Sequence, residues 1–189
     1  MIQENLVTAQ IYKSRPELYE LVYSELKTLP DGLNLEFGVS VGGSLRLFAN
    51  KLGFIYGFDS FLGLEQPWSS LLARKGAFDL GGEIPKSAQN IPNTKLVVGR
   101  VEETLSNFLQ NNSTKISFAH MDLDLYSPTK FVLEQIKPRL QSGSLILFDE
   151  FHGYPGWQNH EWKAFNEVFS ASEFIYLGFS EQQCLVKII

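Results

Sequence analysis

The sequence has little cysteine and methionine and no long apolar run: its 189 residues include one cysteine, Cys184, and two methionines. One thiol cannot form an internal disulfide, so the chain fits a reducing compartment, and we expect it in the cytoplasm. No apolar run has the length of a membrane helix, and no basic and apolar leader is visible. These absences predict a globular protein that makes no membrane contact.

Positive charge is also scarce, because 16 Lys and Arg stand against 21 Asp and Glu, for a net charge of −5. An acidic surface disfavours non-specific binding to nucleic acid, so we expect no nucleic-acid partner. The length and the 44% hydrophobic content suit one domain with a full core. Within it we predict an N-terminal helical segment, residues 1–32, and a main domain, residues 33–189. A homodimer stays open.

Short apolar runs alternate with amphipathic segments along the chain. The runs predict strands at 33–37, 54–58, 95–98, 116–121, 144–148, 174–177 and 183–188. Helices are expected at 16–26, 43–52, from 102, at 127–140 and at 159–170. Alternating strands and helices indicate an α/β, Rossmann-like, doubly wound and mostly parallel sheet. The last two strands have no helix between them and predict a C-terminal antiparallel hairpin at the sheet edge.

A glycine-rich stretch follows the strand at 33–37. Gly38 lets the backbone turn sharply and lets a ligand approach. Gly42, Gly43 and Ser44 open the next helix, whose free N–H groups favour an anionic group. Glu36 would attract an ammonium or a ribose hydroxyl. The spacing E-x-G-x-x-x-G-G differs from the dinucleotide pattern G-x-G-x-x-G and resembles motif I of class I S-adenosylmethionine-dependent methyltransferases. The alternative is an ordinary strand–turn–helix.

Asp59 ends the strand at 54–58. A carboxylate at this place in doubly wound folds accepts from both hydroxyls of a nucleoside ribose, although it could also cap the structure that follows. Residues 65–94 hold glycines, prolines and aromatics, and predict a long loop with one short helix at most. Loops of this length are often lids over a site.

Acidic residues follow two neighbouring strands of the predicted sheet. Asp122 and Asp124 come after 116–121, and Asp149 and Glu150 come after 144–148. Because the carboxyl ends of parallel strands meet at one edge, Asp122, Asp149 and Glu150 can converge, whereas we expect Asp124 to point toward the following helix. Converging carboxylates repel unless a cation or protons compensate their charge, and oxygen ligands suit Mg²⁺, Ca²⁺ or Mn²⁺. Helix capping with solvated strand ends is the alternative.

Together, five stretches resemble the macrocin O-methyltransferase (TylF-like) family: residues 36–44, 59–64, 99–105, 122–129 and 148–150. The resemblance implies a metal-dependent enzyme that uses S-adenosylmethionine to methylate hydroxyls of sugars on natural products. It implies that the methionine end of the cofactor contacts Glu36, Gly38, Ser40, Gly42, Gly43 and Ser44.

The same resemblance implies that Asp59 binds the ribose and that the adenine lies among Ser60, Phe61, Gly99, Arg100 and Val101. Asp122, Asp149 and Glu150 would hold Mg²⁺, with Asp122 also beside the cofactor. Glu150 departs from the aspartate or asparagine that the family pattern predicts.

Two residues are candidates for the base that takes the proton of the acceptor hydroxyl, Asp122 and His152. His152 lies two residues after Glu150, although a plain loop role suits it as well. Asp122-Leu123-Asp124 also matches the D-x-D of glycosyltransferase-like enzymes, which leaves the glycine turn and Asp59 without a role. A non-catalytic binding module on the same fold is the third interpretation.

Overall fold

The computed structural model describes residues 9–69 and 73–189. Its described strands form one sheet, in the order β1-β7-β8-β6-β5-β2-β3-β4. The strands are β1 (Gln10–Ile11), β2 (Leu33–Phe37), β3 (Ile55–Asp59), β4 (Thr94–Val98), β5 (Ile116–Met121), β6 (Leu140–Phe148), β7 (Phe174–Phe179) and β8 (Cys184–Ile188). Strands β2 to β6 pair in parallel, and β8 runs antiparallel to both β6 and β7.

The predicted α/β fold with a C-terminal hairpin is therefore confirmed, with one difference at the edge. The hairpin strand β8 lies inside the sheet, between β6 and β7, and the two-residue β1 extends the sheet beyond β7. Residues 10–11 had no strand signal of their own, because two residues cannot show a period.

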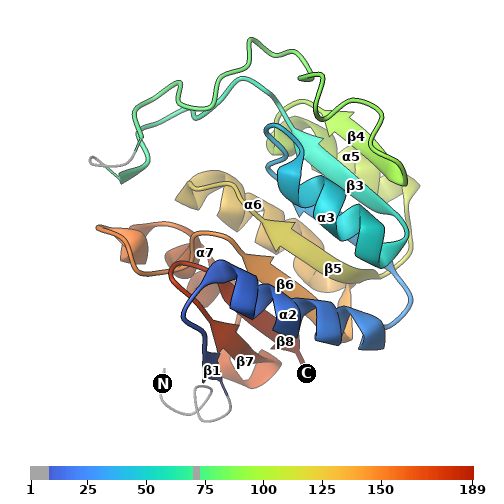
Figure 1. The fold of residues 1–189 in the computed structure, drawn as a ribbon, viewed down its shortest axis with the longest axis vertical. Coiled ribbons are helices and arrows are strands. Elements are labelled where there is room, and N and C mark those ends of the chain that lie inside the picture. Colours follow the sequence, from blue (N-terminus) through green and yellow to red (C-terminus); the bar gives the residue numbers. More distant parts are fainter. Residues whose placement is uncertain (1–8, 70–72) are drawn as a thin grey trace.

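Helices cover both faces of the sheet (Figure 1). Two helices, α2 (Arg15–Glu25) and α3 (Gly43–Leu52), lie on one face. The other face carries α5 (Val101–Asn111), α6 (Tyr126–Ile136) and α7 (Glu161–Val168). Short 3₁₀ turns follow or precede helices at η1 (Leu26–Thr28), η2 (Lys137–Arg139), η3 (Trp157–Asn159) and η4 (Ala171–Glu173).

Side chains of the central strands alternate between the two layers, as the two-residue period of a strand requires. In β6, Ile146 and Phe148 join the cluster of α5, α6 and α7, whereas Leu145 and Leu147 join the cluster of α2 and α3. All four are at most 1% exposed. A parallel sheet covered on both faces explains why these strands read as continuous apolar runs.

The predicted N-terminal segment packs on the same sheet. Helix α2 buries Leu18, Tyr19 and Val22 in the cluster that α3 also joins, and β1 pairs with β7. The described part of residues 1–32 thus shares its core with the main domain, and the boundary at 32/33 stays a prediction.

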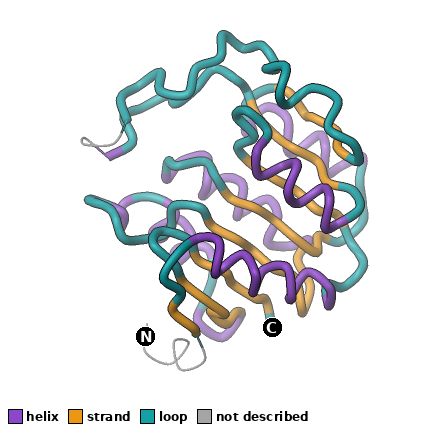
Figure 2. The backbone as a smooth tube through the Cα atoms, viewed as in Figure 1, coloured by secondary structure: helices purple, strands orange, loops and turns teal. Residues whose placement is uncertain are grey.

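A long segment joins β3 to β4 and runs above α6 away from the sheet (Figures 1 and 2). Its described residues, 60–69 and 73–93, contain turns and two isolated bridges, Leu62 to Asp79 and Trp68 to Ala73. This agrees with the long loop predicted for 65–94. None of the helices in the described part of the chain is long and apolar enough to span a membrane.

Candidate active site

The carboxyl ends of β2, β5 and β6 form a single row. Their last residues are in register across the sheet. The next residues, Gly38, Asp122 and Asp149, each donate their amide N–H to a carbonyl oxygen at the end of the neighbouring strand, at 2.9 Å. The residue types that the sequence places directly after the strands therefore stand side by side at one edge of the sheet.

A cavity of about 400 Å³ opens along this row, within the size range of small-molecule sites. Most of the predicted site residues line it: Gly38, Ser40, Asp59, Ser60, Phe61, Gly99, Arg100, Val101, Asp122, Asp149 and Glu150. Five predicted residues are not among those that line it: Glu36, Gly42, Gly43, Ser44 and His152. Other residues that line the cavity were not predicted as site residues, among them Arg15 and Trp68, and Asp124 lines it as well.

The glycine turn closes onto the neighbouring strand. Gly38 has φ +93°, and a Cβ atom on it would collide with the carbonyl oxygen of Asp122. Glycine is therefore required at position 38 because the backbone of Asp122 leaves no room for a side chain, in addition to the close approach of a ligand that we predicted. Gly42, at φ +81°, begins α3, and a Cβ atom there would press on Ala88 and Ile91 of the long segment.

Asp59 joins two turns beside the cavity. Its Oδ2 accepts the N–H groups of Val39 and Ser40 at 2.8 and 2.7 Å, and its Oδ1 accepts that of Phe61 at 2.7 Å. A carboxylate has about four acceptor sites, so one stays open toward the cavity. The predicted ribose-binding residue thus also holds the glycine turn in place.

Glu36 lies beneath the glycine turn and is fully buried. Its Oε1 accepts the hydroxyl of Ser44 at 2.9 Å, and its Oε2 lies 3.4 Å from Nδ1 of His120. Burial alone would lower the pKa of His120, but the contact with Glu36 raises it above the usual value. His120 itself is buried within β5. The predicted contacts of Glu36 and Ser44 with a cofactor gain no support, because both side chains serve this buried network.

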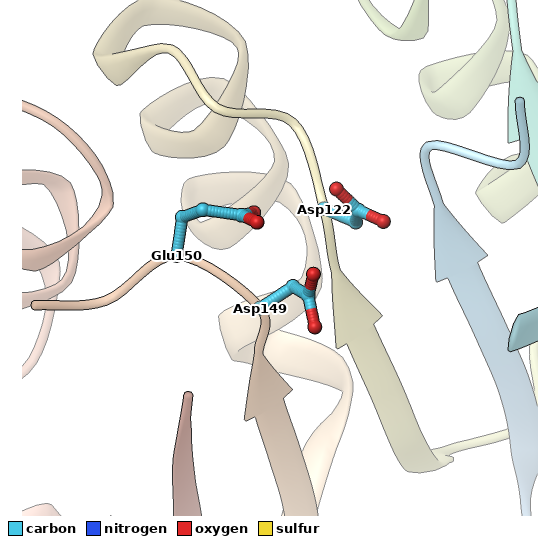
Figure 3. A group of neighbouring side chains, drawn as sticks. All are labelled: Asp122, Asp149 and Glu150. Atoms are coloured by element: carbon cyan, nitrogen blue, oxygen red, sulfur yellow. The ribbon is translucent and has the colours of Figure 1, made fainter. Parts of the chain in front are cut away.

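Three carboxylates gather where β5 and β6 end (Figure 3). Asp122, Asp149 and Glu150 each offer an oxygen, and these oxygens lie within 4.8 Å of one another. Asp149 is 5% exposed and Glu150 is 8% exposed. Among the described residues, Oδ1 of Asp149 and Oε2 of Glu150 are buried without a hydrogen-bond partner. The convergence predicted from strand order is present.

The electrostatics of this carboxylate cluster favour protons or a bound cation. Burial, and then the charges of Asp122 and Asp149, raise the pKa of Glu150 to about 12. Burial and Asp149 also raise the pKa of Asp122 well above its usual value. Three all-oxygen ligands with buried, unpartnered atoms fit Mg²⁺, Mn²⁺ or Ca²⁺ and do not fit a thiolate-seeking metal.

The acidic surroundings are larger than the sequence predicted. Asp124 lines the cavity but, as expected, lies outside the group formed by Asp122, Asp149 and Glu150; burial and then Asp149 raise its pKa to about 7. Glu161, the first residue of α7, is fully buried and accepts the N–H of Leu123 at 3.3 Å. Nothing in the local sequence marks Glu161, which comes to the site through the packing of α7 on α6.

His152 turns away from the cavity. Its ring packs on Phe179 at 5.3 Å between centroids, and backbone groups of Ser180 and Gln183 lie within hydrogen-bonding reach of it. Burial lowers the pKa of His152. The structure therefore does not bring His152 to the carboxylate cluster, and the loop role that we weighed against catalysis describes its position.

Residues 35–151 match a family of sequences described as a methyltransferase domain. The match spans more than half of the chain. This chain belongs to that methyltransferase family. The matched range contains the glycine turn, Asp59 and the whole carboxylate cluster.

Solved structures extend the comparison. The calicheamicin methyltransferase CalS11 is 29% identical, with a TM-score of 0.76 over 92% of this chain and 80% of its own. The O-methyltransferase NovP is 16% identical, with a TM-score of 0.66 over 91% of this chain and 79% of its own. An rRNA methylase from Streptococcus thermophilus shares the fold at 18% identity and a TM-score of 0.55, over 93% and 98% of the two chains. No curated protein matches the sequence.

These comparisons confirm the class I methyltransferase fold and the predicted class of enzyme, a methyltransferase, and methyl transfer to oxygen is part of the proposal that follows. The glycosyltransferase-like and non-catalytic interpretations lose their support, since the family match covers the glycine turn and Asp59, which the first of them left without a role. The acceptor and the metal ion belong to the proposal below.

Proposed function

We propose that this methyltransferase acts on a hydroxyl of a sugar or another natural-product small molecule, and that it requires a divalent ion, Mg²⁺, in the carboxylate cluster. The observation that carries the proposal is that Gly38 and Ser40 of the glycine turn line the same cavity as three carboxylates, of which Asp149 and Glu150 are buried. CalS11 is described as a TDP-rhamnose 3'-O-methyltransferase, which supports a sugar acceptor. We also propose that the chain is a member of the macrocin O-methyltransferase (TylF-like) family.

The cofactor would lie along the row of strand ends. S-adenosylmethionine supplies an electrophilic methyl group when it is bound. The turn from Gly38 to Ser40 would hold its methionine end, and Asp59, which accepts three backbone N–H groups, would accept a ribose hydroxyl at its remaining acceptor site. Phe61 and the turn from Gly99 to Val101 line the part of the cavity where we place the adenine.

The carboxylate cluster would hold the ion through Asp122, Asp149 and Glu150. A divalent ion at this position lowers the pKa of an acceptor hydroxyl. Asp122 is the residue to which we assign proton removal, because it follows Gly38 in the row of strand ends and also faces Asp149. Placing both substrates in one cavity shortens the approach of the acceptor oxygen to the methyl group, and positioning of this kind supplies a large part of catalysis.

The remaining expectations stand with this proposal. We infer a small-molecule acceptor and no nucleic-acid partner, because the chain carries a net charge of −5. We also propose a cytoplasmic location, which the single cysteine, Cys184, buried in β8, supports. A homodimer remains open.

Calorimetry with S-adenosylhomocysteine and Mn²⁺, followed by methyl-transfer assays on TDP-rhamnose and a panel of related sugars, tests the proposal. We expect S-adenosylhomocysteine to bind with or without EDTA. We expect methyl transfer to stop in EDTA and to return with Mg²⁺. A chain that does not bind S-adenosylhomocysteine would overturn the cofactor assignment. Full activity in EDTA would overturn the metal assignment and leave Asp122 as a simple base.

A further inference from the structure

Helix α2 places a cation directly on the carboxylate cluster. Nη2 of Arg15 lies 2.8 Å from Oδ2 of Asp149. Arg15 is the first residue of α2, and its side chain is 45% exposed, whereas Asp149 is 6% exposed. The guanidinium thus reaches from the mouth of the cavity to a buried carboxylate.

The position of Arg15 is well determined by its own helix. Later in the same helix, Leu18, Tyr19 and Val22 are buried against the sheet. The start of α2 therefore cannot shift without exposing them. The other basic residue that lines the cavity, Arg100, pairs instead with Glu65 of the long segment. Among the described lining residues, Arg15 is therefore the only cation that contacts the carboxylate cluster.

Asp149 has two oxygens in different surroundings. Oδ2 accepts from Arg15, and Oδ1 is buried without a hydrogen-bond partner in the described chain. An ion on Oδ1 and the guanidinium on Oδ2 would be two positive charges on one carboxylate. Such charges repel strongly where water screens them little.

We propose that Arg15 is a built-in counter-cation of the metal site, which neutralises Asp149 until a divalent ion replaces it. This inference rests on the proposed function, because it takes the carboxylate cluster to be the ion site. Arg15 then sets the affinity for the ion: the ion must offset the loss of the Arg15 contact as well as its own hydration. Removal of the guanidinium strengthens ion binding, although it removes a contact from the protein.

The test is a Mn²⁺ titration of the full chain by calorimetry, without cofactor, for the wild type, Arg15→Gln and Arg15→Lys. We expect Arg15→Gln to bind Mn²⁺ about tenfold more tightly, because the repulsion is gone. Arg15→Lys should lie between the two, since it keeps the charge and loses the fork of the guanidinium. The matched control is Lys13→Gln, which removes the same charge from an exposed residue beside α2 and should leave the affinity unchanged.

Thermal unfolding gives a second reading on the same variants. In EDTA, Arg15→Gln should unfold at a lower temperature than the wild type, and Mn²⁺ should raise its midpoint by more than it raises that of the wild type. Equal or weaker Mn²⁺ binding by Arg15→Gln would overturn the counter-cation role while the metal site stood. If the wild type itself bound no Mn²⁺, the metal part of the proposed function would fail as well.

Discussion

The ring of Trp68 packs against the ring of Tyr154, with centroids 5.2 Å apart and planes at 61°. Tyr154 in turn donates its hydroxyl to the carbonyl oxygen of Glu150 at 3.2 Å. Trp68 belongs to the long segment between β3 and β4, and Glu150 belongs to the carboxylate cluster. This pair of rings therefore connects the segment above the cavity to the proposed metal site.

Replacing Trp68 by alanine should release the long segment. Trp68 is 8% exposed, so the change removes a buried aromatic contact and leaves space beside Tyr154 and Leu125. We expect faster hydrogen exchange in residues 62–68 and 150–154, and a higher KM for the acceptor with little change in S-adenosylhomocysteine affinity. Phe54→Ala, at a half-exposed aromatic outside the cavity lining, is the control. Unchanged exchange in 150–154 would show that the two segments are not coupled.

The long segment should also respond to ligand. We predict that S-adenosylhomocysteine or an acceptor increases the hydrogen-exchange protection of residues 65–94, because segments of this length above a cavity commonly close on ligand. The exchange of α3, none of whose residues lines the cavity, serves as an internal reference. Equal and strong protection with and without ligand would make the segment a plain scaffold.

Asp59→Ala should weaken both cofactor binding and the fold. Three backbone N–H groups lose their acceptor, and we expect a loss of about 1–3 kcal/mol in the free energy of unfolding. Affinity for S-adenosylhomocysteine should fall by a few kcal/mol, since charge-assisted hydrogen bonds to the ribose disappear. Asp79→Ala removes a similar bond, to the N–H of Gly81, outside the cavity lining and should spare the affinity. Unchanged calorimetry on Asp59→Ala would remove Asp59 from the cofactor site.

Asp149→Ala should lower turnover far more than cofactor affinity. The residue supplies a buried oxygen to the carboxylate cluster, and loss of an ion that activates the acceptor costs about 100-fold or more in kcat. Asp124→Ala should be milder, because Asp124 lines the cavity but is not one of the three carboxylates within 4.8 Å of one another. Steady-state kinetics with saturating cofactor separate the two, and equal losses would place Asp124 in the ion site.

Glu161→Gln should become more stable, relative to the wild type, as the pH rises. Burial, and then Asp124 and Asp122, raise the pKa of Glu161 well above its usual value. The folded protein therefore holds a proton that the unfolded chain has lost, and the stability of the wild type falls as the pH rises above the unfolded pKa. Glutamine keeps the acceptor for Leu123 without that cost. Urea titrations in EDTA at pH 5 and 8 measure the free energy of unfolding of both proteins. The advantage of Glu161→Gln over the wild type should be larger at pH 8 than at pH 5, and an equal difference at both values would contradict the prediction.

The sequence by itself determined where the strands lie, how strands and helices alternate, and that the candidate site lies at the carboxyl ends of the strands. Strand ranges such as 33–37 and 116–121 agree with the structure because short runs rich in apolar residues are a local signal. Asp122, Asp149 and Glu150 could be grouped because parallel strands bring their carboxyl ends to one edge, whatever the loops do.

Only the tertiary structure decided which other side chains join that edge and which turn away. Arg15 contacts Asp149 across 134 positions of the chain, and Glu161 is buried at the start of α7, where it accepts the N–H of Leu123; no local pattern predicts either contact. Glu36 and His152 carry the residue types that a site needs, yet one is buried beneath the glycine turn and the other packs on Phe179. Position after a strand follows from local periodicity, whereas the direction of a side chain depends on what packs around it.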